Sequence, residues 1–88
     1  MYKIVYTKTA VKDIPKLKSN KLDKKARQLI ELITKNPYAN PPRYEKLIGS
    51  LADLYSRRIN IQHRLIYQVY EEEKTIKIIS LWSHYERI

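Results

Sequence analysis

One carboxylate, two arginines and a late histidine are the residues of this sequence whose types and order could do chemistry. The carboxylate is Glu45, and the histidine is His84, close to the end. The arginines are Arg58 and Arg64, which lie in the segment SRRINIQHRLIYQVY (residues 56–70). Metal-free RNA cleavage needs a base for the 2′-hydroxyl proton, an acid for the leaving 5′-oxygen and fixed positive charge beside the phosphate. Glu, His and Arg supply these three functions, and DNA lacks the internal nucleophile.

A β-hairpin would hold the two arginines in place. Residues 55–61 and 64–70 are rich in β-branched and aromatic side chains, which predicts two strands with a turn near Gln62. If that turn has an odd number of residues, Arg58 and Arg64 lie opposite each other on one face. Two cations at that distance repel unless an anion lies between them, which indicates a phosphate site.

Each of these residues also fits a role without chemistry. Glu45 is compatible with an ordinary surface carboxylate, His84 with a packed residue at a sheet edge, and the arginines with solvated strand residues that blunt an edge. His63, at the hairpin turn, favours a structural or surface role. Most tyrosines are expected in the core and the sheet, with Tyr55 and Tyr85 the best placed to stack on a base.

Length and composition predict one soluble domain spanning residues 1–88. Eighty-eight residues support a single modest core, and a hydrophobic content of 43% is typical of a folded chain. There is no cysteine and there are only two histidines, so we expect neither a disulfide nor a metal site, and no cofactor. No apolar run approaches the roughly 20 residues that span a bilayer, and the first residues lack the apolar core of a secretory signal. We therefore expect a cytoplasmic protein that does not contact a membrane.

The formal net charge of +9 is the strongest compositional signal, and it is uneven. Residues 1–40 hold ten basic residues against three acids, and three of the remaining acids form the run at 71–73, which is typical of a solvated hairpin turn. The rest of the surface is therefore more basic than the total indicates. This charge favours a polyanionic partner, either nucleic acid or an acidic protein, although a lysine-rich surface that only confers solubility remains open.

The hydrophobic pattern predicts an α+β fold of order β-α-α-β-β-β, with two N-terminal helices packed on a mostly antiparallel sheet. A first strand is expected at residues 2–7, followed by a helix capped by Thr7 or Thr9 and interrupted or kinked at Pro15. The second helix has one apolar stripe and should end near Asn36, before a proline-rich loop at residues 36–43. The three last strands are expected at residues 55–61, 64–70 and 75–82, with turns near Gln62 and at 71–74.

The segment YEKLIGSLADLYSRRINIQHRLIYQVY (residues 44–70), together with the terminal SHY at 83–85, resembles the YoeB/Txe toxins of the RelE/ParE superfamily, from bacterial type II toxin–antitoxin modules. The shared pattern is Glu-x-Leu, an aromatic-Ser-Arg-Arg-Ile, a His-Arg-Leu-Ile-Tyr and a final His-Tyr. The second half of the chain carries the resemblance closely. The first half matches mainly in length, helix order and basic character.

This resemblance implies a ribosome-dependent endoribonuclease that enters the A site, cuts mRNA there and halts translation. Glu45 would be the general base, His84 the general acid, Arg64 the transition-state stabiliser with Arg58 as the second cation, and Tyr85 a residue that positions the substrate. The RNA-binding residues expected beside this catalytic set are Lys46, Arg57, Tyr55, Lys21, Lys24 and Lys25. The partners implied are a cognate antitoxin of the YefM/Axe type with an acidic segment and the ribosome with its mRNA. Whether the toxin is a monomer or a homodimer remains open from the sequence.

The sequence departs from the family pattern at three positions. Ile48 stands where a lysine is frequent, Asp53 where a glycine is common and Tyr55 where a tryptophan is common. Two other functions remain open from the sequence. One is a catalytically silent relative that inhibits a protein such as DNA gyrase, and the other is a basic RNA-binding module without activity. The presence of a complete Glu/Arg/His set favours the nuclease.

Overall fold

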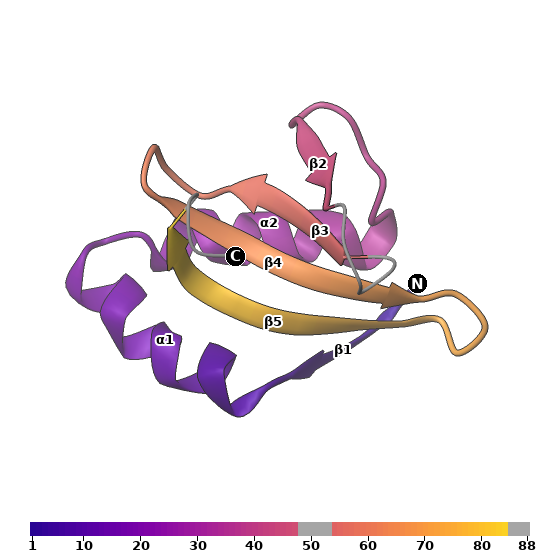
Figure 1. The fold of residues 1–88 in the computed structure, drawn as a ribbon, viewed down its shortest axis with the longest axis horizontal. Helices are drawn as coiled ribbons and strands as arrows, with labels where there is room; N and C mark the ends of the chain where they lie inside the picture. The colour runs from indigo at the N-terminus through magenta and orange to yellow at the C-terminus, as the bar shows by residue number, and fades with distance from the viewer. Residues whose placement is uncertain (48–53, 85–88) are drawn as a thin grey trace.

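The protein folds as a five-stranded sheet with two helices, as the computed structural model in Figure 1 shows. The structure describes residues 1–47 and 54–84, and for His84 it describes the backbone alone. In chain order the elements are β1 (Lys3–Tyr6), α1 (Lys8–Ser19), α2 (Asp23–Lys35), β2 (Tyr44–Lys46), β3 (Leu54–Arg58), β4 (His63–Tyr70) and β5 (Thr75–His84). The predicted α+β class is confirmed.

The strand order across the sheet is β1-β5-β4-β3-β2. All neighbours pair antiparallel except β1, which lies parallel to β5 at one edge. The sequence did not predict β2, because three residues are too few to show an alternating pattern. This short strand matters, since it adds Glu45 to the sheet next to β3.

Both predicted helices form, and a side-chain cap marks the start of α1. The Thr7 hydroxyl caps α1 by accepting a hydrogen bond from the Ala10 amide at 3.0 Å, and it donates to the Ile79 carbonyl of β5 at 2.7 Å. The helix continues across Pro15 to Ser19 without the expected break. Pro15 removes only the bond to the carbonyl of Val11, whose residue is 54% exposed, so water can satisfy that carbonyl.

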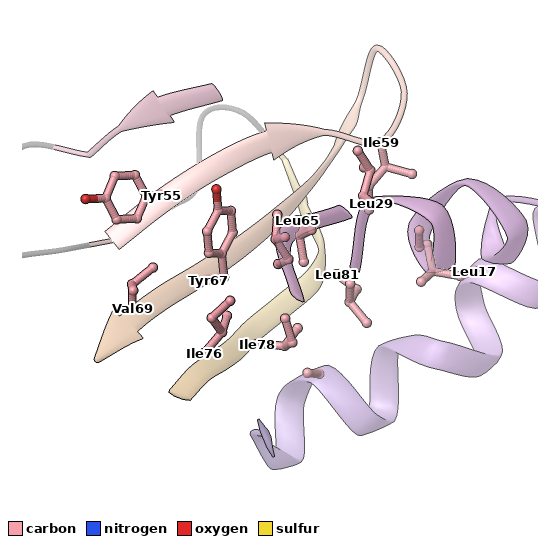
Figure 2. Close-up of a cluster of buried hydrophobic side chains, with 13 residues drawn as sticks. Leu17, Leu29, Tyr55, Ile59, Leu65, Tyr67, Val69, Ile76, Ile78 and Leu81 are labelled. Atoms are coloured by element: carbon pink, nitrogen blue, oxygen red, sulfur yellow. The ribbon is translucent and has the colours of Figure 1, made fainter. Parts of the chain in front are cut away.

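One hydrophobic core joins both helices to the same face of the sheet (Figure 2). Leu17 from α1 and Leu29 from α2 pack in the same cluster as Leu65, Tyr67 and Val69, which alternate along β4. The cluster also contains Ala10, Ala26, Ile33, Tyr55, Ile59, Ile76, Ile78 and Leu81. Because alternate residues of a strand point to opposite faces, Arg64 and Ile66 belong to the other face of the sheet.

The faces of β5 differ from a simple alternation. The pattern predicts Ile76, Ile78, Ser80 and Trp82 on one face and Leu81 on the other, but Leu81 is 2% exposed in the core with Ile76 and Ile78. The register against β4 shifts twice near Ile66, so β5 holds extra residues there. Such β-bulges change which face the following side chains occupy. The expectation for Leu81 was therefore wrong.

The turn between β4 and β5 is more than a solvated acidic loop. The Glu71 carboxylate accepts hydrogen bonds from the Tyr2 hydroxyl at 2.9 and 3.1 Å, from the Tyr38 hydroxyl and from the Lys74 ammonium at 3.1 Å. These bonds, with that from Tyr38 the largest contribution, lower the pKa of Glu71. Burial and the nearby Glu71 carboxylate raise the pKa of Tyr38. Glu71 thus ties the N-terminus, the loop after α2 and the last hairpin together.

Candidate active site

The β3–β4 hairpin places the two central arginines opposite each other. Arg58 pairs with Arg64 in the antiparallel ladder, as expected for a turn with an odd number of residues, although β3 ends at Arg58 and not at residue 61. Ser56 of β3 pairs with Glu45 of β2. Directly opposed residues of antiparallel strands share a face, and so do residues two apart along one strand. Glu45, Ser56, Arg58 and Arg64 therefore lie on one face of the sheet, the face away from Tyr67.

These four residues line a cleft of about 420 Å³. The segment that leads into β2, the tip of the β3–β4 hairpin and helix α2 form its walls. The lining residues are Lys25, Leu29, Pro42, Arg43, Tyr44, Glu45, Ser56, Arg58, Ile59, Asn60, Ile61 and Arg64. The cleft therefore contains four cationic side chains and one carboxylate beside an apolar wall.

The carboxylate lies directly beside a buried guanidinium. Glu45 Oε1 is 3.7 Å from Arg64 Nη1, the Glu45 side chain is 38% exposed and the Arg64 side chain is 6% exposed. A charge at this depth is screened less by water than a surface charge, so its interaction with an anion in the cleft is stronger. Arg64 is held by the ladder and Glu45 is open to solvent, which suits a fixed electrostatic group and a group that exchanges protons.

Ser56 lies between these charges and was not singled out from the sequence. It is 2% exposed, and its hydroxyl makes no hydrogen bond to any of the residues at 1–47 and 54–84. A small side chain at this position leaves room for Glu45 and Arg64 to approach each other across β3. The signal that could have found Ser56 is its alternation with Arg58 on the same strand.

The end of β5 brings the candidate acid to the same end of the sheet. His84 pairs with His63, and Ser83 pairs with Arg64, so the backbone of His84 lies one residue from the Arg64 register position. The His84 side chain lies outside the described part of the structure, as do Tyr85 and the family-variable positions Ile48 and Asp53. Their roles therefore remain predictions.

His63, the other histidine, is a packed residue. It is 6% exposed, and its ring stacks on Trp82 with centroids 3.7 Å apart and planes 18° apart. Its Nδ1 lies 3.3 Å from the Trp82 carbonyl oxygen. These contacts agree with the structural role that the sequence favoured for His63.

Arg57 was expected to bind RNA, and the structure places it in the interior instead. The residue is 0% exposed, and its guanidinium donates hydrogen bonds to the carbonyls of Pro37 at 3.1 Å, Ala39 at 2.8 Å and Pro42 at 2.7 Å and to the Tyr67 hydroxyl at 3.1 Å. Strand alternation puts Arg57 on the core face, one residue away from the cleft-facing Arg58. Arg57 is a structural residue that fixes the loop before β2.

Tyr55 was also expected on the RNA-binding surface and is a core residue. It is 7% exposed, and its ring stacks on Tyr67 at 5.6 Å and meets Tyr38 and Tyr44 edge-on at 5.6 and 5.8 Å. Burial raises the pKa of Tyr67, with the nearby Arg57 acting in the opposite direction. The aromatic cluster leaves no open face of Tyr55 for a base, because it pairs with Tyr67 on the helix-covered face.

The predicted lysines all lie at the surface, but only one of them lines the cleft. Lys21, Lys24 and Lys46 are exposed outside the cleft, whereas exposed Lys25 on α2 is part of its lining. Arg43, which the sequence analysis missed, also lines the cleft, two residues before Glu45. No sequence pattern marked Arg43, because it ends a proline-rich loop that has no periodicity.

Across residues 1–47 and 54–84, no group of three or more histidine, cysteine, aspartate or glutamate side chains is arranged to hold a metal ion. In the same residues neither helix has the length and apolar content needed to cross a bilayer.

The sheet of order β1-β5-β4-β3-β2 with its two N-terminal helices is the fold of RelE/ParE toxins. It matches the YoeB/ParE toxin from Agrobacterium tumefaciens with a TM-score of 0.84 at 28% identity, covering 94% of this chain and 99% of that one. The model of the family described as "YoeB-like toxin of bacterial type II toxin-antitoxin system" matches residues 6–85. Toxin YoeB of Synechocystis is 34% identical over 87 residues, which cover 97% of this chain and 99% of that toxin.

Solved structures agree with these sequence matches. The YoeB–YefM complex from Staphylococcus aureus superposes with a TM-score of 0.79 at 35% identity, covering 97% of this chain and 99% of that one. The YoeB dimer from the same organism gives a TM-score of 0.81 at 36% identity, covering 96% and 98%. The chain therefore belongs to the YoeB family of toxins from bacterial type II toxin–antitoxin systems, which confirms the resemblance seen in the sequence.

Proposed function

We propose that this toxin is a metal-independent endoribonuclease that cuts mRNA on the ribosome. The observation that carries the proposal is the position of Glu45, 3.7 Å from buried Arg64 and on the same face as Arg58, in one open cleft. A base beside fixed positive charge is the arrangement that 2′-hydroxyl attack on a phosphodiester requires.

In the proposed reaction Glu45 removes the proton from a 2′-hydroxyl, and the 2′-oxygen forms a bond to the adjacent phosphorus. The bond from phosphorus to the 5′-oxygen breaks, and that oxygen takes a proton from His84. The products are a 2′,3′-cyclic phosphate and a 5′-hydroxyl. Arg64, with Arg58 opposite, stabilises the negative charge that builds on the phosphate oxygens, and Tyr85 positions the substrate.

The partners of the toxin follow from its charge and from its relatives. The Staphylococcus aureus relative was solved in complex with YefM, and we extend this to a cognate antitoxin whose acidic segment covers the basic cleft in the inhibited state. The exposed lysines Lys21, Lys24 and Lys46 are proposed to contact ribosomal RNA, which would make ribosome binding depend on salt. A homodimer, as in the second Staphylococcus structure, is a further assembly proposed for the free toxin.

The test is cleavage of an mRNA on programmed ribosomes, mapped by primer extension, for the wild type and for Glu45→Gln, Arg64→Gln and His84→Ala. Loss of the base or the acid should slow cleavage about 10²- to 10⁴-fold. Loss of a charge stabiliser should slow it about 10²- to 10³-fold. A wild-type toxin that leaves the ribosome-bound transcript intact would exclude the nuclease. Toxicity that persists in Glu45→Gln and His84→Ala would instead favour inhibition of a protein target.

A further inference from the structure

The cleft holds more positive charge than the cut phosphate requires. Arg64 contacts Glu45 at 3.7 Å and Arg58 lies opposite Arg64, so these two cations account for the reacting phosphate. Two other cations, Lys25 and Arg43, line the same cleft from different elements. A second site for negative charge would explain their presence there.

Nothing in the described protein neutralises these two cations. Within residues 1–47 and 54–84, neither Lys25 nor Arg43 forms an ion pair or a side-chain hydrogen bond. The residues three and four positions from Lys25 are Lys21 and Leu22, just before α2, and Gln28 and Leu29 within it, and none of them is acidic. Like charges that converge on a concave surface raise the local concentration of anions.

The distance of Arg43 from the reacting centre matches the spacing of phosphates in a nucleic acid backbone. Arg43 immediately precedes β2 and lies two residues before Glu45, which in an extended chain corresponds to about 7 Å. That separation is comparable to the distance between successive phosphates in an RNA strand. Lys25 approaches the cleft from α2, one turn before Leu29, which contributes to the apolar part of the lining. The apolar wall would accommodate the sugar or base between the two phosphates.

We propose that Lys25 and Arg43 form a second phosphate subsite, which binds the phosphodiester next to the one that is cut. The inference rests on the proposed nuclease function and adds a substrate requirement to it, since the cleft then takes at least two consecutive phosphates of a single strand. The proposal also gives different roles to Lys25 and its exposed neighbour Lys24 on α2, because Lys24 lies outside the cleft lining. Lys25 binds the substrate, whereas Lys24 contacts other surfaces.

Lys24 provides a matched control, because Lys24→Gln and Lys25→Gln remove the same charge from adjacent positions of one helix. The probe is an RNA trinucleotide with 2′-O-methyl groups, which cannot be cut, titrated into each purified protein and followed by NMR. Lys25→Gln should bind about tenfold more weakly than the wild type and should lower the salt dependence, expressed as the slope of log K on log[salt], by about 0.7. Lys24→Gln should leave both values close to the wild type, and Arg43→Gln should behave like Lys25→Gln.

A second trinucleotide, in which one phosphate is replaced by a neutral methylphosphonate, identifies the phosphate that is bound. Against this probe, with the neutral group at the position adjacent to the cut, Lys25→Gln and the wild type should bind equally. Equal weakening by Lys24→Gln and Lys25→Gln, or no binding of either probe by the wild type, would overturn the subsite. Cleavage of mRNA on ribosomes is scored separately, so a failed subsite with intact cleavage leaves the nuclease proposal standing, and absent cleavage refutes that proposal by itself.

Discussion

Two carboxylates near opposite ends of β4 illustrate how the same side chain serves different purposes. Glu71, just after the strand, accepts hydrogen bonds from two tyrosine hydroxyls and one lysine. Glu45, beside the start of the strand, makes its single ion pair among the described residues at 3.7 Å, with Arg64. A carboxylate that the protein has saturated with donors stabilises the fold. One that faces surplus cations in an open cleft is available to a substrate.

The adjacent arginines of β3 show the same difference. Arg57 donates to three carbonyl oxygens and a tyrosine hydroxyl and is 0% exposed, whereas Arg58 is exposed at the cleft. The first holds the loop that leads to β2 and hence the position of Glu45. The second faces Arg64 across the hairpin. Two neighbouring arginines thus have different roles because they lie on opposite faces of the strand: Arg57 is structural, and Arg58 is proposed to take part in the chemistry.

The largest expected effect is a difference between the two carboxylates in RNA cleavage. Glu45→Gln should slow cleavage on programmed ribosomes about 10²- to 10⁴-fold, because the amide cannot take the 2′-hydroxyl proton. Its urea unfolding midpoint should remain close to that of the wild type, since the side chain is 38% exposed. Glu71→Gln is the matched control and should cleave at the wild-type rate. Equal losses in both variants would contradict the assignment of chemistry to Glu45.

A large effect on stability is expected from the buried arginine. Arg57→Leu removes the donor to the carbonyls of Ala39 and Pro42, whereas the Pro37 carbonyl keeps its hydrogen bond from the Tyr67 hydroxyl at 2.7 Å. Each unsatisfied buried group costs about 1–3 kcal/mol, so the free energy of unfolding should fall by about 2 kcal/mol or more. Urea unfolding measures this change. Arg58→Leu is the control on the cleft face and should leave the midpoint nearly unchanged. A stable Arg57→Leu variant would show that the hydrogen bonds of Arg57 do not hold the loop.

The sequence was sufficient to predict that Arg57 and Arg58 lie on opposite faces of the strand, but it did not predict that Arg57 is buried. Alternation along residues 55–61 assigns Arg58 to the face of Arg64 and places Tyr55 and Arg57 on the core face, so their assignment to RNA binding overlooked the pattern. What makes a buried guanidinium tolerable is a set of carbonyls in the loop at residues 37–42, which lie 15 to 20 positions away. Such long-range hydrogen bonds leave no periodic signal in a single sequence.

The candidate site was predictable to the extent that it depends on strand register. The pairing of Arg58 with Arg64 was expected for a turn with an odd number of residues, but the predicted strands at 55–61 and 64–70 did not fix that number. The pairing of β2 with β3, which brings Glu45 to the same face, was not predicted, because a three-residue strand carries too little pattern. The convergence of Lys25 and Arg43 on the cleft depends on how α2 packs against the sheet, and packing geometry cannot be read from residue types.

The smallest expected effect concerns the acid stability conferred by Glu71. Hydrogen bonds from Tyr38 and Tyr2 lower the pKa of Glu71 in the folded protein below its ordinary value of 4.5. A lowered pKa means that the carboxylate stabilises the fold above about pH 4.5 and that this contribution is lost as the pH falls through the lowered value. Wild type and Glu71→Gln should therefore differ slightly in urea midpoint at pH 7 and converge as the pH falls below the lowered pKa. A difference that persists or grows in acid would contradict the role given to Glu71.

The central claim, cleavage by an internal 2′-hydroxyl with Glu45 as its base, is tested most directly by removing that hydroxyl. Programmed ribosomes carrying an mRNA with a single 2′-deoxynucleotide at the mapped cleavage position are incubated with wild-type toxin, beside the all-ribose transcript. The all-ribose transcript should give fragments ending in a 2′,3′-cyclic phosphate and a 5′-hydroxyl, and the deoxy transcript should remain uncut at that position. Cleavage of the deoxy transcript at the same position and rate would show that the 2′-hydroxyl is not the nucleophile and would contradict the proposed mechanism.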